Sequence, residues 1–187
     1  AFSTSYENDY LNMLRILTLS RVPIRAADRG PADPLVTMGG VCAWSNPEPL
    51  AAFVYWFFLG EGEESSHEVF ELLERVREAE RDPAAAREAF FRALCGLDGI
   101  YVPRFYDVKY HEDGTVAEVV AYEGAPLPVR KRRLLNTNAY DTISMVRTAH
   151  TEFGEMARRE VGKGCGRSCR FCMEGEIYRP VRQRRIQ

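Results

Sequence analysis

The chain has 187 residues, a formal net charge of −2 and a hydrophobic content of 45%, which is the composition of a folded globular protein and not of a disordered or fibrous one. Its longest apolar run, AAFVYWFFLG at residues 51–60, is far too short to cross a bilayer, so we expect no membrane partner. The five cysteines are an odd set without a secretory signal, which argues against a disulfide framework and for the reducing cytoplasm. Cys42 and Cys95 lie in apolar sequence and are expected in the core.

The first hundred residues alternate between short apolar segments and helical patterns. FSTSY (2–6) has the composition of a strand end, and ENDYLNMLRILTLS (7–20) spaces its apolar residues as an amphipathic helix does. VPIRAAD (22–28) is compatible with a short strand. PLVTMGG (34–40) and FVYWFFLG (53–60) predict two buried parallel strands that end in glycine.

Three further segments predict helices: NPEPLAAF (46–53) with Asn46 as its N-cap, SSHEVFELLERVREAER (65–81) with a capping box of Ser65 and Glu68, and DPAAAREAFFRALCG (82–96). Alternating strands and helices of this kind predict an α/β fold, in which helices cover an open parallel sheet. A doubly wound sheet of this type has around five strands, so only part of the sheet is present. The missing strands are expected upstream of Ala1, because the chain begins without Met.

The pattern changes after residue 100. VPRFYDVKYHEDGTVAEVVAYEG (102–124) has two alternating runs around a turn at residues 111–114, which predicts a β-hairpin. APLPVRKRRLL (125–135) has the composition of a linker, and its RKRR run is better explained as solvated charge than as a nucleic-acid patch. EMARREVGKG (155–164) predicts a strand that leads into the cysteines.

Glycines follow both of the predicted parallel strands. Gly39 and Gly40 end the first, and Gly60, Glu61 and Gly62 follow the second. Open α/β sheets bind ligands at the carboxyl ends of their strands, so these five residues are candidate cofactor contacts. Tight turns explain the same glycines equally well, and the residues alone do not decide between the two interpretations.

Charge is distributed unevenly along the chain. From Arg158 onward there are nine Lys/Arg and three Asp/Glu, a net +6, so the preceding residues carry −8. A basic end of this kind suits nucleic acid or an anionic cofactor. A solvated surface, or one covered by further chain, is the simpler explanation, and nucleic acid is the less favoured partner.

Three cysteines near the end of the sequence have the spacing C-x3-C-x2-C, at Cys165, Cys169 and Cys172. A disulfide would use two of the three, and a closed zinc site needs a fourth ligand, which no other Cys or His supplies at a usual spacing. Three thiolates suit an iron–sulfur cluster with one iron left open for a substrate. The flanking glycines allow the backbone to curl around such a cluster, and Arg167 and Arg170 would offset its charge.

The segment CGRSCRFC (165–172) resembles the C-x3-C-x-aromatic-C motif of the radical SAM superfamily, with Phe171 in the aromatic position. The resemblance implies that Cys165, Cys169 and Cys172 bind a [4Fe–4S] cluster and that Phe171 lies at the cofactor site. It also implies that S-adenosylmethionine chelates the open iron, and that an electron donor reduces the cluster so that a 5′-deoxyadenosyl radical forms. The cofactor supplies this chemistry and the protein positions it.

The segments LVTMGG (35–40), NPEPLA (46–51) and FVYWFFLGEGEE (53–64) resemble the cobalamin-binding-like domain of one branch of that superfamily. HTEFGEM (150–156) and IYRPVR (177–182) are most similar to an uncharacterised bacterial group of the branch. Cobalamin is therefore an additional candidate cofactor. The D-x-H-x-x-G motif that supplies an axial histidine to cobalt is absent.

The resemblance also implies a domain division. We expect a partial cobalamin-binding-like domain over residues 1–100, a hairpin and linker over 101–150, and the first strand and cluster loop of a truncated barrel over 151–187. The rest of the barrel would be the partner of this chain, which by itself would be inactive and hold no cluster. The alternative function is a non-catalytic metal- or RNA-binding module with a structural zinc site.

Overall fold

The computed structural model describes residues 1–150, 152–154 and 156–185. The chain divides into two compact units, Ala1–Arg133 and Leu134–Gln187, and each is described by itself. Thr151 and Glu155, which belong to the segment HTEFGEM (150–156), lie outside the described residues. None of the described helices is long and apolar enough to span a membrane.

A four-stranded sheet forms the centre of the first unit. Its strands lie in the order β1 (Phe2–Ser3), β2 (Thr37–Gly39), β3 (Trp56–Phe58) and β4 (Ile100–Tyr101). The first three strands are parallel, whereas β4 pairs with β3 in the antiparallel direction. The predicted α/β class, with parallel strands and covering helices, is confirmed. The antiparallel edge strand was not predicted, because two residues are too few to show a strand period.

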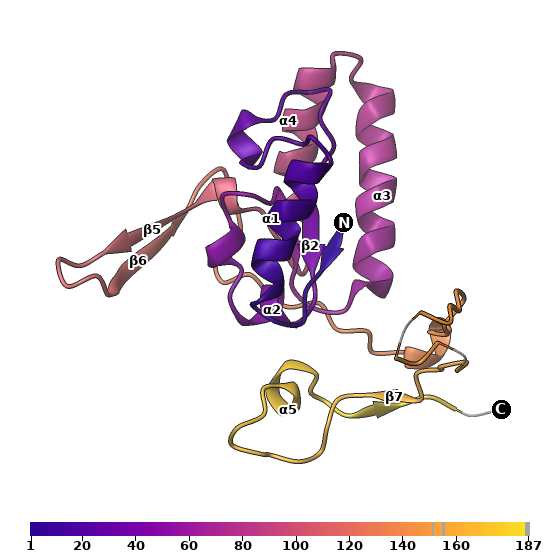
Figure 1. Cartoon of the computed structure of the whole chain (residues 1–187). Coiled ribbons are helices and arrows are strands. Elements are labelled where there is room, and N and C mark those ends of the chain that lie inside the picture. Colours follow the sequence, from indigo (N-terminus) through magenta and orange to yellow (C-terminus); the bar gives the residue numbers. More distant parts are fainter. Residues whose placement is uncertain (151, 155, 186–187) are drawn as a thin grey trace. The chain divides into compact units, whose positions relative to one another are not determined.

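Helices cover this sheet (Figure 1). They are α1 (Asp9–Leu19), α2 (Val41–Ser45), α3 (Gly62–Ala79) and α4 (Pro83–Leu94), with 3₁₀ turns at Ala26–Asp28, Glu48–Leu50 and Pro103–Phe105. The predicted helix at 82–96 is confirmed as α4, where the Asp82 carboxylate accepts the Ala85 N–H at 2.8 Å as an N-cap. The helix predicted at 7–20 is confirmed as α1.

Three local predictions need correction. The capping box at Ser65 is wrong: α3 already begins at Gly62 after an N-cap at Glu61, and the Ser65 hydroxyl donates to the Glu61 carbonyl at 3.2 Å. The strand at 22–28 is also wrong, because the Arg29 side chain occupies the carbonyls of Pro23 and Ile24 that a strand would need.

The third correction concerns the segment 46–53. It forms a single 3₁₀ turn at Glu48–Leu50 and not a longer helix. The N-cap of this turn is Pro47 and not Asn46, although the Asn46 side-chain oxygen accepts the Glu48 N–H at 3.1 Å. The chain must reach β3 within a few residues, which leaves no room for a second helical turn.

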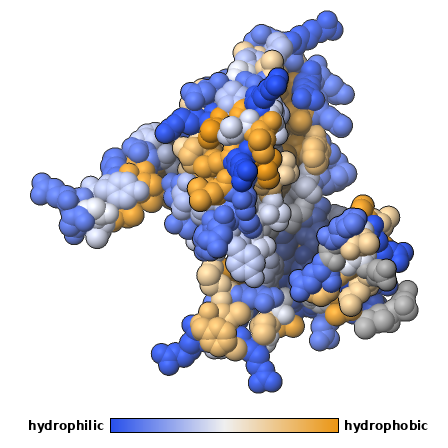
Figure 2. All heavy atoms as spheres, in the orientation of Figure 1, coloured by the Kyte–Doolittle hydropathy of each residue, from blue (hydrophilic) through white to orange (hydrophobic). Residues whose placement is uncertain are grey.

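The core of the first unit lies between the sheet and the helices. Phe57 on β3 is fully buried and contacts Tyr101. Phe90 and Phe91 of α4 pack on its neighbours in the chain, Trp56 and Tyr55. Helix α1 buries only Met13 and Leu17. Its outer face carries exposed Leu11, Ile16 and Leu19, and Figure 2 shows apolar side chains gathered on that side of the unit.

The predicted hairpin is confirmed as β5 (Tyr106–Tyr110) and β6 (Val116–Ala121), an antiparallel ribbon that projects from the first unit (Figure 1). Within the segment 125–135, which is predicted to be a linker, the backbone of Arg132 packs into this unit. The Arg132 N–H donates to the Leu59 carbonyl at 2.8 Å, and its carbonyl accepts the Glu61 N–H at 3.1 Å. The boundary between the two units therefore follows Arg133.

The second unit contains a 3₁₀ turn at Thr137–Ala139, β7 (Gly162–Lys163), α5 (Glu174–Ile177) and β8 (Arg182–Gln183). Strands β7 and β8 form a two-stranded antiparallel sheet. The strand predicted at 155–164 is present only as β7, immediately before the cysteines. The described residues form no closed barrel.

Candidate functional site

The three cysteines lie in one closed loop between β7 and β8, residues 164–181, which we call the cysteine loop. The loop begins at Gly164, whose φ of +83° is in the left-handed region. A side chain there would clash with the Tyr178 carbonyl, because the start of the loop passes close to its end. Glycine is thus required for the loop to close.

Short local interactions shape the interior of the cysteine loop. The Cys172 N–H donates to the Cys169 carbonyl at 3.1 Å, which folds the C-x2-C segment into a turn. Helix α5 follows, and its buried Gly175 lies so near the Arg167 carbonyl that a Cβ would be 2.9 Å from it. The single turn of α5 therefore packs against the first part of the loop.

All three thiols of the loop are free. Cys169 is exposed, Cys165 and Cys172 are half-buried, and the backbone N–H of Arg167 lies 3.4 Å from the Cys165 sulfur as a donor. Hydrogen bonds to thiolate sulfur are one of the means by which proteins stabilise and tune iron–sulfur centres. The donor set thus fits the chemistry of a cluster with three protein ligands.

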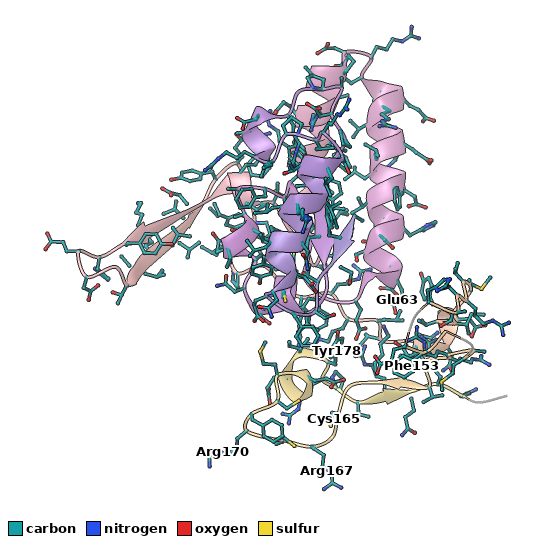
Figure 3. The ribbon with its side chains drawn as sticks, in the orientation of Figure 1. Glu63, Phe153, Cys165, Arg167, Arg170 and Tyr178 are labelled. Atoms are coloured by element: carbon teal, nitrogen blue, oxygen red, sulfur yellow. The ribbon has the colours of Figure 1, made fainter. Side chains whose placement is uncertain are left out.

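The sulfurs are not assembled as a metal site. Within residues 1–150, 152–154 and 156–185, no group of three or more His, Cys, Asp or Glu side chains is placed to hold a metal ion. Phe171 is 91% exposed. The Arg167 and Arg170 side chains extend outward from the loop (Figure 3). The structure therefore supplies the ligands on one loop without the geometry that a bound cluster would impose.

Two arginines of β8 and its flank hold the base of the cysteine loop, and no sequence pattern pointed to either of them. Arg182 donates to the carbonyls of Leu134 (2.6 Å) and Tyr178 (3.1 Å). Arg184 is buried and donates to the Glu160 carboxylate at 2.6 Å. Its remaining acceptors are the carbonyls of Thr137 and Tyr140 and the Thr142 hydroxyl.

These contacts bear on the basic end of the chain. Not every Lys and Arg from Arg158 onward is a surface charge, because Arg184 lies inside the second unit and Lys163 is 3.6 Å from the Glu160 carboxylate. In the first unit, Arg132 of the RKRR run is paired with Glu64 and Glu68 at 2.9 and 2.7 Å. Part of the basic sequence is therefore structural.

The candidate glycines of the first unit are brought to one edge of the sheet. Because β2 and β3 are parallel neighbours, the turns after Gly39 and after Phe58 lie side by side, and the Trp44 indole N–H donates to the Gly60 carbonyl at 2.9 Å. A Cβ at Gly62 would meet open space. The neighbouring Glu61 is buried, with 5% of its surface exposed.

The chain's own backbone occupies the space beside two of these glycines. Gly40, at φ +97°, faces the backbone of Thr4, and Gly60, at φ +129°, faces that of Arg132. A side chain at either position would collide with these peptide groups. Close approach of two backbone segments is thus a sufficient reason for both glycines, and a ligand at this edge stays a prediction.

The first unit offers cobalamin no axial histidine at this edge. His67 of α3 is mostly exposed and contacts Glu71 at 3.3 Å. His111 lies in the turn of the hairpin, where its carbonyl accepts the Gly114 N–H. The donor chemistry that would mark a histidine-ligated cobalt is therefore not found among the described residues of this unit.

Comparison with known proteins places the chain in a wider context. Residues 1–103 match the family model described as radical SAM proteins, N-terminal. An uncharacterised protein of Methanocaldococcus jannaschii is 26% identical over 182 residues, which are 97% of this chain but 31% of that protein. The chain thus spans about a third of the length of this relative. No solved structure shows a significant match.

Proposed function

The chain belongs to the family of radical SAM proteins through their N-terminal domain, and from this premise we propose that its cysteine loop is the cluster-binding segment of a radical SAM enzyme. The observation that carries the proposal is the C-x3-C-x2-C set of free thiols in one loop, closed by β7 and β8, in a member of that family. The cysteine loop lies outside the residues that match the family model, so it supports the proposal independently.

The protein's own groups have simple roles in this proposal. Cys165, Cys169 and Cys172 would ligate three irons of a [4Fe–4S] cluster as thiolates, and the Arg167 N–H would stabilise the Cys165 sulfur. When bound, such a cluster supplies the electron that cleaves S-adenosylmethionine to a 5′-deoxyadenosyl radical. Arg182 and Arg184 would hold the ends of the loop in place.

We further propose that the chain is one part of a longer enzyme. The relative from Methanocaldococcus jannaschii, which is about three times as long, supports this interpretation. The remaining length would contain the βα units of the barrel and the residues that contact S-adenosylmethionine. An electron donor is the implied partner. Substrate and reaction product would depend on that part of the enzyme.

Anaerobic reconstitution tests the proposal. The longer protein is loaded with iron and sulfide, and EPR spectra are recorded after reduction, before and after addition of S-adenosylmethionine. We expect about four irons per chain, as in a [4Fe–4S] centre, and a change of the EPR signal when the methionine moiety binds. The 187-residue chain alone is expected to bind fewer irons, because part of the enclosure is missing.

Matched cysteine variants make the test specific. Cys165→Ala, Cys169→Ala and Cys172→Ala should each lose the EPR signal, whereas Cys95→Ala should keep it, because Cys95 lies in the first unit. A zinc-loaded protein without an EPR signal would contradict the proposal and support a structural zinc site. Retention of a full cluster in all three loop variants would contradict it as well.

A further inference from the structure

A pocket of about 820 Å³ lies in the first unit, at the edge of the sheet opposite the glycine turns. Tyr55, which lines it, comes immediately before β3, and Pro103 follows the antiparallel strand β4. The pocket therefore lies at the amino ends of the parallel strands. Open α/β sheets bind their usual ligands at the carboxyl ends, so this pocket is a different site. Its volume is in the range of pockets that bind small molecules.

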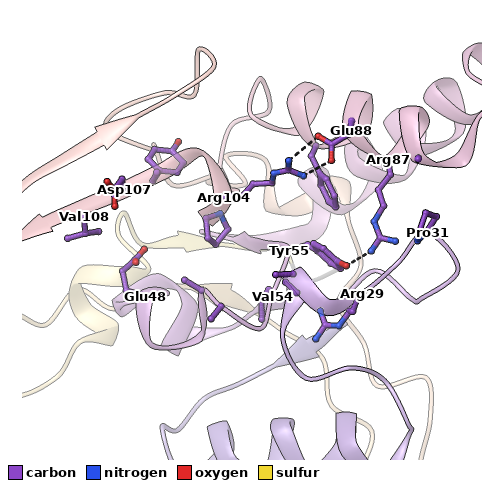
Figure 4. Close-up of a pocket in the computed structure, with 18 of the residues that line it drawn as sticks. Arg29, Pro31, Glu48, Val54, Tyr55, Arg87, Glu88, Arg104, Asp107 and Val108 are labelled. Atoms are coloured by element: carbon purple, nitrogen blue, oxygen red, sulfur yellow. Dashed lines mark hydrogen bonds and ion pairs between the residues drawn. The ribbon is translucent and has the colours of Figure 1, made fainter.

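Two guanidinium groups lie on the same tyrosine in this pocket (Figure 4). The guanidinium carbons of Arg29 and Arg87 are 5.3 and 4.6 Å from the centroid of the Tyr55 ring. Arg29 follows the 3₁₀ turn Ala26–Asp28 and Arg87 belongs to α4, so segments far apart in the sequence bring the two positive charges together.

Neither guanidinium is paired with a carboxylate. Arg29 is 7% exposed, and its Nε and Nη2 donate to the carbonyls of Pro23 (2.7 Å) and Ile24 (2.6 Å). Arg87 donates to the Gly30 carbonyl and to the Tyr55 hydroxyl oxygen. These acceptors are neutral. Among the described residues, neither arginine lies within ion-pair distance of an acidic side chain.

The buried arginine also has an unused donor. Nη1 of Arg29 is enclosed and has no hydrogen-bond partner in the described structure. Burial, and to a smaller extent the charge of Arg87, lowers the pKa of Arg29, while Tyr55 and Asp33 act in the opposite direction. Buried charges are normally paired, because leaving one unpaired is costly. The buried charge of Arg29 therefore has no ion-pair partner among the described residues.

The carboxylates that line the pocket belong to Glu48, Glu88 and Asp107, and the first two contact other side chains. Arg104 forms a bidentate ion pair with Glu88 at 2.8 and 3.0 Å, as Figure 4 shows. Glu48 accepts a hydrogen bond from the Tyr101 hydroxyl. Asp33 accepts the Gly30 N–H at 2.7 Å. Asp107 lies on the exposed strand β5 of the hairpin. Arg29 and Arg87 thus lack an ion-pair partner among the described residues, beside an apolar wall that includes Val54 and Phe91.

We propose that this pocket binds a small organic anion, whose carboxylate or phosphate lies against Arg87 and Tyr55 and whose apolar part rests on the wall of the pocket. Arg87 is half-buried and retains N–H groups that can contact such an anion. The Tyr55 oxygen accepts from Arg87, so its own O–H is free to donate. The Arg29 guanidinium, 5.3 Å from the centroid of the Tyr55 ring, adds a second positive charge. The proposal does not depend on the cluster or on S-adenosylmethionine.

Titration calorimetry on the 187-residue chain tests the proposal with phenyl phosphate, phenylacetate, inorganic phosphate and benzyl alcohol. We expect one of the two organic anions to bind with a dissociation constant below about 1 mM, and the inorganic ion and the neutral alcohol to bind at least about tenfold more weakly. The preference between phenyl phosphate and phenylacetate identifies the anionic group. Higher salt should weaken binding.

Variants on the same helix provide the control. Arg87→Gln should weaken binding by about tenfold or more, as expected for loss of a charge-assisted hydrogen bond. Arg92→Gln should leave it unchanged, because Arg92 is exposed and paired with Glu123. Tyr55→Phe keeps the ring and should weaken binding less, and circular dichroism confirms that each variant is folded. Absence of binding by both organic anions at about 10 mM, or unaltered binding by Arg87→Gln, would overturn the proposal.

Discussion

The two units of the chain are stabilised by different kinds of interaction. In the described residues, every buried hydrophobic side chain except Leu134 belongs to the first unit. The second unit is organised instead around Arg184, which donates to main-chain and side-chain oxygens from residues 137–160. A hydrophobic core specifies a fold through many small contacts, whereas a single buried arginine concentrates the stabilisation in one residue.

This difference suits different tasks. The first unit has a packed α/β core, which can keep a small-molecule pocket in a fixed shape. The second unit presents three thiols on a loop that is fixed at its base by Arg182 and Arg184 and is open elsewhere. A loop of this kind can rearrange around a metal centre without disturbing the core of the first unit.

The largest effect is expected from the core of the first unit. Phe57→Ala should lower the free energy of unfolding by about 4 kcal/mol, since Phe57 is fully buried between sheet and helices. Urea denaturation followed by tryptophan fluorescence measures this directly, because Trp44 and Trp56 both lie in this unit. Phe70→Ala on α3 is the control, since Phe70 is 65% exposed and its loss should have little effect.

The second unit should depend on Arg184 to a comparable degree. Arg184→Met leaves the Glu160 carboxylate and two carbonyls without their donor, which should cost about 3 kcal/mol locally. Hydrogen exchange should become faster in residues 137–142, while the tryptophan transition of the first unit stays unchanged. Arg185→Met, whose side chain is exposed, should change neither. If Arg184→Met also destabilised the first unit, the result would contradict the expectation that the two units unfold independently.

Substitutions of Gly60 and Gly62, in the turn after β3, should change stability less, and their two effects should differ. Gly60→Ala forces a side chain toward the Arg132 backbone at a φ of +129°, and should cost about 2 kcal/mol or more. Gly62→Ala places its Cβ in open space at the start of α3, and should be neutral or slightly stabilising. Thermal unfolding compares the two variants. Equal effects would show that Gly60 is not held by backbone contact with Arg132.

The sequence predicted those elements that local chemistry determines. Asp82 followed by Pro83 marks the start of α4, and the apolar run around Phe57 marks β3, because a cap and a buried strand need few distant partners. The Ser65 capping box was wrong for the opposite reason. The turn at Gly60 is set by Arg132, which lies 72 residues further along the chain, so no local pattern around Ser65 could reveal where α3 begins.

The candidate sites likewise have one part that local sequence predicts and another that depends on distant residues. The spacing of Cys165, Cys169 and Cys172 predicts the donor set, since three thiols within eight residues necessarily share a loop. It does not predict the arginines that close the loop. Arg29 and Arg87 could not be paired from sequence either, because only the packing of α4 against the segment before β2 brings both to Tyr55. Long-range packing, not residue type, creates that site.

The reactivity of the cysteines compares the two units without a substitution that changes their stability. Burial, and secondarily Glu123, raises the pKa of Cys95 to about 11, and Cys42 is buried. Iodoacetamide at pH 8 reacts with thiolates, so mass spectrometry should find Cys169 labelled first and Cys42 and Cys95 protected until urea unfolds the first unit.

The same raised pKa predicts the direction of a pH effect. Above the ordinary cysteine pKa of 9.0, the unfolded chain loses the Cys95 proton while the folded chain retains it up to about pH 11. The unfolded state therefore binds fewer protons in this window, and stability of the first unit falls as pH rises through it. Cys95→Ser should flatten this dependence between pH 9 and 11, measured by urea denaturation. An unchanged slope would mean that burial of the Cys95 thiol does not contribute to it.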